Sequence, residues 1–368
     1  MSNPRRGWLA AGLITAVAVS SAAGWNASAH ADEIPRLPAA AEAEPTPPAL
    51  PSGERPTTLK LAPAGSTSAE IAALDADAAP ADADTSPEPK PVYAPKGRAP
   101  LADLQSSPFP SPPRALSAAP LDGRYHYAGG RRIRFKDNNP DTPDEPNFIS
   151  SYAYLPISKP ELAAADEHTL TEISMQTADG KQIVEVGWTV DRRVNGDDDP
   201  HLFVFHWVDG KPTCYNGCGF VPESNASIKP GATLPIGTSM RFGIMYSAGN
   251  WWIFYGGEWI GRFPDTLWGA TQFNQAEAVQ WFGEVVTATE QSCTDMGNGK
   301  LAEDSAASEI NRIQATFVGP ANPPQPTRPN PQIFPQPEEG EPKPAYTAVR
   351  LNSSSFRYGG GGTGPCTS

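Results

Sequence analysis

Basic residues are scarce in this chain. Its 368 residues include 28 lysines and arginines against 41 aspartates and glutamates, so the formal net charge is −13 at pH 7. Nucleic-acid binding needs a basic surface that neutralises phosphates, and this balance therefore argues against a nucleic-acid partner. The negative charge would instead keep an exported protein in solution.

Several motifs of catalysis and metal binding are missing from the sequence. It has no G-x-S-x-G nucleophile elbow, no H-E-x-x-H sequence and no second pair of closely spaced cysteines. Four histidines outside the N-terminal segment lack metal-ligand spacing: His126, His168, His201 and His206. We therefore expect neither a metal ion nor a cofactor.

Cysteine is also rare, with only four residues: Cys214, Cys218, Cys293 and Cys366. An even number of cysteines in an exported protein predicts two disulfides, for which three connectivities are possible. The segment CYNGC resembles a tight loop closed by its own bridge. We therefore expect the pairs Cys214–Cys218 and Cys293–Cys366.

Long apolar runs are absent except at the N-terminus. There, Arg5 and Arg6 precede an apolar stretch that ends in the small-residue site Ala29-His30-Ala31. This arrangement is typical of a secretory signal peptide at residues 1–31 and argues against a membrane anchor. After cleavage we expect a secreted, soluble monomer with no membrane contact.

Composition divides the rest of the chain into four segments. Residues 32–120 are rich in Ala, Pro, Asp, Glu and Ser, a composition that predicts a disordered arm, either a propeptide or a spacer. Residues 121–318 are dense in aromatic and β-branched residues and are long enough for one domain. A Pro-rich linker at 319–345 and a tail at 346–368, a candidate edge strand, complete the chain.

The folded segment has the pattern of an all-β protein. Short apolar runs such as FISSYAYLPI, HLFVFHWV and SMRFGIMYSA are separated by Gly, Pro, Asn and Asp. WWIFY and EWIGRF flank Gly256-Gly257, which predicts a hairpin. We expect an antiparallel β-sandwich of two sheets, flanked by disordered Pro-rich segments.

Two glutamates interrupt otherwise apolar strands. In IVEVGW, Glu185 alternates with Val184, Val186 and Trp188, and in VQWFGEVV, Glu284 lies on the face opposite Trp281. Carboxylates in hydrophobic strands are costly unless they are compensated, and paired carboxylates can perform acid–base hydrolysis. The simpler interpretation is that each glutamate faces solvent, and the pattern alone leaves both possibilities open.

Four sequence blocks resemble the neprosin family, which comprises glutamic endopeptidases of plants and bacteria associated with cleavage next to proline. The blocks occur in the family's order: VEVGWTV, NGDDDPHLFVFHWVDGKPTCYNGCGFV, GNWWIFYGGEWIGRFP and VQWFGEVV. The resemblance implies a two-sheet sandwich whose catalytic residues are Glu185 and Glu284. It also implies a local disulfide between Cys214 and Cys218.

This resemblance leads to a functional hypothesis. One glutamate would activate water and the other would polarise the scissile carbonyl, most effectively in acid, on proline-containing peptides or proteins. Candidate walls of a proline pocket are Trp188, Tyr215, Trp251 and Trp252. Two alternatives use the same residue types, namely a non-catalytic binding module for carbohydrate or peptide and a two-carboxylate glycosidase.

Overall fold

The computed structural model describes residues 45, 47–48, 124–134, 146–289, 292–318, 326–335 and 344–363. All of them belong to one compact unit, Pro45–Ser368. The predicted signal peptide, nearly all of the predicted arm and Cys366 lie outside the described residues.

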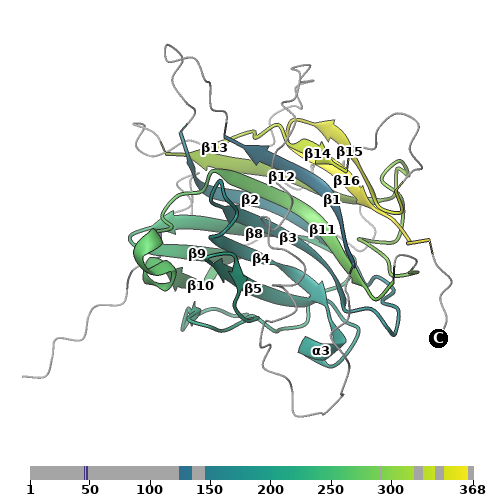
Figure 1. Cartoon of the computed structure of the whole chain (residues 1–368), viewed down its shortest axis with the longest axis horizontal. Coiled ribbons are helices and arrows are strands. Elements are labelled where there is room, and N and C mark those ends of the chain that lie inside the picture. Colours follow the sequence, from purple (N-terminus) through teal and green to yellow (C-terminus); the bar gives the residue numbers. More distant parts are fainter. Residues whose placement is uncertain are drawn as a thin grey trace, which may run out of the picture. The chain divides into compact units, whose positions relative to one another are not determined.

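Within the described residues the fold consists of two antiparallel sheets (Figure 1). The first sheet has seven strands in the order β14 (Gln332–Phe334), β1 (Arg124–Ile133), β11 (Ala278–Thr287), β3 (His168–Gln176), β4 (Ile183–Val190), β5 (His201–Val208) and β6 (Lys211–Pro212). The expectation of an all-β antiparallel sandwich is confirmed.

The second sheet has nine strands. Their order is β15 (Thr347–Asn352), β16 (Ser355–Gly359), β12 (Ser308–Phe317), β2 (Phe148–Ile157), β8 (Thr238–Ser247), β9 (Asn250–Tyr255), β10 (Glu258–Pro264) and β7 (Val221–Pro222), and β13 (Pro326–Thr327) pairs with β12. The C-terminal hairpin of β15 and β16, yellow in Figure 1, forms one edge of this sheet.

The core lies between the two sheets because each strand turns alternate residues inward. On β4, Val184, Val186 and Trp188 belong to the core cluster, while the residues between them face away. On β9, Trp251 and Ile253 are directed inward in the same way. The sheets meet where β4 packs against β8 and β3 packs against β2. Each sheet therefore has an outer face whose side chains do not belong to this core.

Short connections complete the fold. The predicted hairpin is confirmed, since β9 and β10 pair across Gly256, whose φ of 64° suits glycine. A single helical turn, α3 (Arg192–Asn195), follows β4 and is capped by the Asp191 carboxylate, which accepts from two backbone amides. A 3-10 segment, η1 (Asp265–Thr271), links β10 to β11.

Candidate active site

The strand register places Glu185 and Glu284 on the outer face of the first sheet. Glu185 on β4 pairs with Ser174 on β3, and Ser174 in turn pairs with Gln280 on β11. Gln280 and Glu284 are four residues apart on one strand, so their side chains share a face. Both glutamates therefore point away from the core, on the same side of one sheet.

The two glutamates do not face each other directly across the strands. Glu284 pairs with Leu170, four residues before Ser174 on β3. Midway between these positions lies Glu172, which pairs with Gly187 on β4 and with Phe282 on β11. Each of the other two glutamates is thus a diagonal neighbour of Glu172, at a typical separation of about 7–8 Å between backbones. The three carboxylates form a diagonal row, which we call the carboxylate row.

All three members of the carboxylate row are fully buried, each with 0 % exposure. Buried carboxylates of like charge repel one another, so the three cannot all be ionised without compensation. Two hydrogen bonds provide part of that compensation. The Trp207 indole Nε1–H donates to Glu185 Oε1 over 2.9 Å, and His168 Nε2 lies 2.7 Å from Glu284 Oε1.

His168 forms an acidic cluster with Glu284 and Glu167. Its Nδ1 lies 3.7 Å from Glu167 Oε1, and Glu167 also pairs with Arg193 at 3.6 Å. Burial by itself would lower the pKa of His168, but the hydrogen bonds and negative charges of the two glutamates outweigh it and raise this pKa to about 9. The imidazolium is therefore the cation opposite Glu284 at neutral and acidic pH.

An aromatic cluster borders the other end of the carboxylate row. Phe205 pairs directly with Glu185 across the strands, and Phe203 and Trp207 lie on the same face of β5. The Tyr215 ring approaches Phe203 at 5.4 Å and Phe205 at 5.0 Å between centroids. This cluster of Phe203, Phe205, Trp207 and Tyr215, hereafter the β5 aromatic cluster, gives Glu185 an apolar border.

The candidate pocket walls lie in three different places. Tyr215 is half-buried beside the carboxylate face, in the β5 aromatic cluster. Trp188 and Trp251 lie in the core between the sheets, where their indole N–H groups donate to Pro156 O and Phe273 O. Trp252 lies on the outer face of the second sheet. Of these four residues, the structure brings only Tyr215 close to the glutamates.

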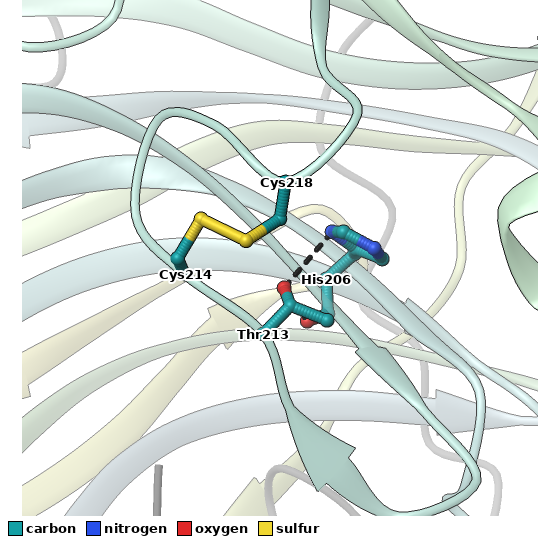
Figure 2. The surroundings of a disulfide bond; sticks show 4 residues. All are labelled: His206, Thr213, Cys214 and Cys218. Carbon is teal, nitrogen blue, oxygen red and sulfur yellow. Dashed lines mark hydrogen bonds between the residues drawn. A yellow bond between two sulfur atoms is a disulfide. The ribbon is translucent and has the colours of Figure 1, made fainter. Parts of the chain in front are cut away.

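The first predicted disulfide is confirmed. Cys214 and Cys218 are bonded within the loop that follows β6, and Figure 2 shows the bridge beside Thr213, whose hydroxyl is hydrogen-bonded to the His206 ring. Cys293 is also disulfide-bonded, and its expected partner Cys366 lies outside the described residues. The bridge fixes the loop that carries Tyr215.

Neither a metal-binding cluster nor a membrane-spanning helix occurs among the described residues. No group of three or more His, Cys, Asp or Glu side chains is arranged to hold a metal ion there. In the same part of the chain, no helix is long and apolar enough to cross a membrane.

Sequence reasoning missed Glu172, His168 and Trp207. Glu172 carries the same signal as the two predicted glutamates, because in LTEISM it interrupts an apolar strand. His168 and Trp207 carry no comparable signal. Their contacts with Glu284 and Glu185 join positions that are 116 and 22 residues apart in the chain.

Known proteins resemble this chain in sequence and in fold. A family model described as Neprosin matches residues 165–361, more than half of the chain. A crystal structure of Scytalido-glutamic peptidase with a peptide-based transition state analog is 9 % identical, covers 64 % of this chain and 99 % of that one, and has a TM-score of 0.38. SCP-B, described as a member of the Eqolisin family of peptidases, is 7 % identical with the same coverages and a TM-score of 0.35. Chicken galectin 2 is 6 % identical, covers 44 % of this chain and 95 % of that one, and has a TM-score of 0.26. Structural likenesses this low carry no argument about function.

Proposed function

The chain belongs to the neprosin family, and from this premise we propose that it is a secreted glutamic endopeptidase that cleaves next to proline and works best in acid. Membership of the family supports a peptidase. The observation that carries the finer proposal is the carboxylate row, in which Glu185, Glu172 and Glu284 are buried on one face of one sheet.

In this proposal Glu284 is the general base. The His168 imidazolium at 2.7 Å stabilises the ionised form of its carboxylate. A water molecule bound by Glu284 would lose a proton to it while the water oxygen attacks the scissile carbonyl carbon. When the C–N bond breaks, that proton passes to the leaving amine, which returns Glu284 to its ionised form.

Glu185 is the corresponding acid. Its Oε1 accepts the Trp207 indole N–H, so in the protonated carboxyl group the proton resides on Oε2. This proton would neutralise the carbonyl oxygen as the tetrahedral intermediate forms, and it would return when the carbonyl is restored.

Glu172 explains why acid should favour the reaction. Because it lies between the other two carboxylates, it competes with them for the protons that relieve their repulsion. As the pH falls, the row gains the proton that Glu185 must hold, while His168 continues to favour the ionised form of Glu284.

Preference for proline is attributed to the β5 aromatic cluster. Phe205 and Trp207 are 4 % and 3 % exposed and lie next to Glu185, and Tyr215 completes the cluster from the disulfide-closed loop. The half-buried Tyr215 ring offers a rigid apolar surface on which a pyrrolidine ring can pack, and the buried rings of Phe205 and Trp207 support it. Trp188 and Trp251 are excluded from this role by their place in the core.

Secretion is proposed from the N-terminal sequence, with residues 1–31 as a signal peptide. The Cys214–Cys218 disulfide agrees with an oxidising compartment. We further propose that the enzyme acts as a monomer.

The test is hydrolysis of a quenched peptide that contains one proline, measured from about pH 2.5 to 7, a range that includes the ordinary pKa of Glu. The purified full chain is compared with Glu185→Gln, Glu284→Gln and Glu172→Gln. We expect acid-favoured cleavage, and a loss of about 10²- to 10⁴-fold in kcat for the first two variants. Glu309→Gln is the matched control, since Glu309 lies on β12 in the second sheet.

Two results would contradict the proposal. Cleavage that survives Glu185→Gln or Glu284→Gln in a folded protein would exclude that residue as a catalyst. If the wild-type chain is folded and cleaves no peptide but binds oligosaccharides, the binding-module alternative would replace the peptidase. A matched peptide with alanine in place of proline tests the specificity separately from the chemistry.

A further inference from the structure

A second aromatic surface lies on the outer face of the second sheet. Tyr152 on β2, Trp252 and Phe254 on β9, and Trp259 on β10 form a cluster separate from the core. Register confirms that they share a face, because Phe254 pairs with Trp259 and the Gly243 opposite it pairs with Tyr152. We call these four residues the aromatic patch. Their exposures are only 0–8 %, although they lie on an outer face.

Two arginines lie over the aromatic patch. The Arg241 guanidinium carbon is 4.8 Å from the centre of the Tyr152 ring, and that of Arg262 is 5.3 Å from the Trp252 ring. Arg262 is 7 % exposed, yet its Nε and Nη1 have no hydrogen-bond partner among the described residues. Buried guanidinium donors without partners are costly, which indicates that this surface is suited to an acceptor or an anion.

A segment from the predicted arm contacts the patch. The Trp259 indole Nε1–H donates to the carbonyl oxygen of Pro48 over 2.9 Å, across 211 positions of sequence. Pro45, Pro47 and Pro48 are all partly buried. Two acidic residues, Glu42 and Glu44, directly precede them in the sequence AEAEPTPP.

Proline-rich sequence such as residues 45–48 offers rings and free backbone carbonyls, which an aromatic surface with hydrogen-bond donors can bind. Proline fixes φ and favours the polyproline II conformation, in which the backbone carbonyls have no partner within the chain. Recognition of these chains commonly uses aromatic grooves whose donors reach the free carbonyls, as Trp259 does here.

We propose that the aromatic patch is a binding site for proline-rich chain in the polyproline II conformation, and that residues 45–48 of this same chain are its ligand. The site recognises proline rings, which stack on its aromatic rings, a carbonyl oxygen that accepts from the Trp259 indole N–H, and a further acceptor for the Arg262 guanidinium.

This site is separate from the carboxylate row. On β9 the core residues Trp251 and Ile253 alternate with the patch residues Trp252 and Phe254. The patch therefore lies on the outer side of one sheet and the glutamates lie on the outer side of the other. Pro48 is thus held by a surface that takes no part in the proposed hydrolysis, and the test needs no activity.

The test monitors the indole N–H signals of the full chain labelled with ¹⁵N-tryptophan. Trp259→Phe, which keeps an aromatic ring, identifies the Trp259 signal. Replacement of Pro45, Pro47 and Pro48 together by alanine should shift that signal upfield, because the hydrogen bond to residue 48 is lost. Titration of this alanine variant with the peptide acetyl-EAEPTPPA-amide should restore the signal, whereas a peptide with alanines in place of the prolines should bind at least tenfold more weakly.

Arg262→Gln in the alanine variant separates charge from stacking. We expect its affinity for the peptide to fall several-fold at low salt and to differ less at high salt. Two outcomes would overturn the proposal: a Trp259 signal that is unchanged by the three substitutions, or restoration by the alanine peptide as effective as by the proline peptide. A control resonance, that of the core residue Trp251, should stay in place throughout.

Discussion

His206 should limit the stability of this protein in acid. Its ring packs against Phe263 and Trp268, with centroids 4.8 and 5.5 Å away. Figure 2 shows His206 beside Thr213. The Thr213 hydroxyl donates its single proton to the His206 carbonyl oxygen at 2.6 Å. The same hydroxyl oxygen lies 3.0 Å from His206 Nδ1, so Nδ1 is the donor of that bond. A second proton would have to be placed on Nε2, in an aromatic environment.

The magnitude of this effect is set by the protonation equilibrium. Burial lowers the pKa of His206 from 6.5 to about 4. Between these two values the unfolded chain binds a proton that the folded chain does not, so stability is complete above pH 6.5 and is lost as the pH falls toward 4. The difference corresponds to a loss of about 3 kcal/mol for this one group.

The assay compares the wild type with His206→Asn. The asparagine Nδ2 can donate to Thr213 as the imidazole Nδ1 does, but it does not titrate. Free energies of unfolding are measured in urea at several pH values between 4 and 7. We expect the variant to be less stable at pH 7, because it loses ring packing, but to lose about 2–3 kcal/mol less than the wild type between pH 7 and 4.

A direct measurement accompanies the unfolding series. The imidazole C2–H resonance of His206, identified by its absence in the variant, should not titrate above about pH 5 in the folded protein. Titration of that resonance near pH 6.5, or an equal loss of free energy in both proteins between pH 7 and 4, would refute this prediction.

Two further predictions concern the carboxylate face. In the wild type, the stabilisation by the His168 charge is complete below pH 6.5 and about 3 kcal/mol of it is lost as the pH rises toward 9. His168→Gln should remove this pH dependence, which is measured as the free energy of unfolding in urea. If the free energy of unfolding of the variant depends on pH between 6.5 and 9 as that of the wild type does, the stabilising positive charge is not on His168. Trp207→Phe should lower kcat about 10- to 100-fold with little change in KM, and should move the alkaline limb of the activity profile to higher pH, because the indole N–H stabilises ionised Glu185. If KM rises and kcat is unchanged, Trp207 contributes to substrate binding and not to the chemical step.

The face of each glutamate could be predicted from its own strand, but the relation between the two strands could not. Period-two alternation places Glu185 opposite Val184 and Val186 without any tertiary information. The offset between Glu185 and Glu284 depends on the register of β4, β3 and β11, and this register cannot be predicted from the sequence of any one of these strands. Glu172 became part of the site only through that register, because it pairs with Gly187 and Phe282.

Strand β1 went unpredicted for a physical reason. Its sequence RYHYAGGRRI contains two glycines and three arginines, which weaken the apolar pattern of a strand. Gly129 is nevertheless suited to its place, because a Cβ there would lie 2.3 Å from the Trp281 carbonyl oxygen. Close contact with β11 thus favours glycine at a position where strand propensity disfavours it.

The tryptophan walls show a different limit of the sequence. Trp251 and Trp252 are adjacent on a strand, so they must point to opposite faces, and the sequence does not say which face is the core. The structure places Trp251 inside and Trp252 in the aromatic patch. Neither residue is close to the carboxylate row. Trp207 is close to it, but the sequence HLFVFHWV is apolar at nearly every position and does not show which residues face the core.

The charges of the two buried histidines define the conditions in which the proposed mechanism can operate. His168 remains protonated to about pH 9, so the cation that favours an ionised Glu284 is present throughout the acidic range. Protonation of the carboxylate row, which supplies the acid, increases as the pH falls. His206 acts in the opposite direction, since each step from pH 6.5 toward 4 reduces the stability of the fold. The chemistry therefore improves toward low pH while the fold weakens. From this we infer that the loss of stability caused by protonation of His206 opposes the gain in activity at low pH.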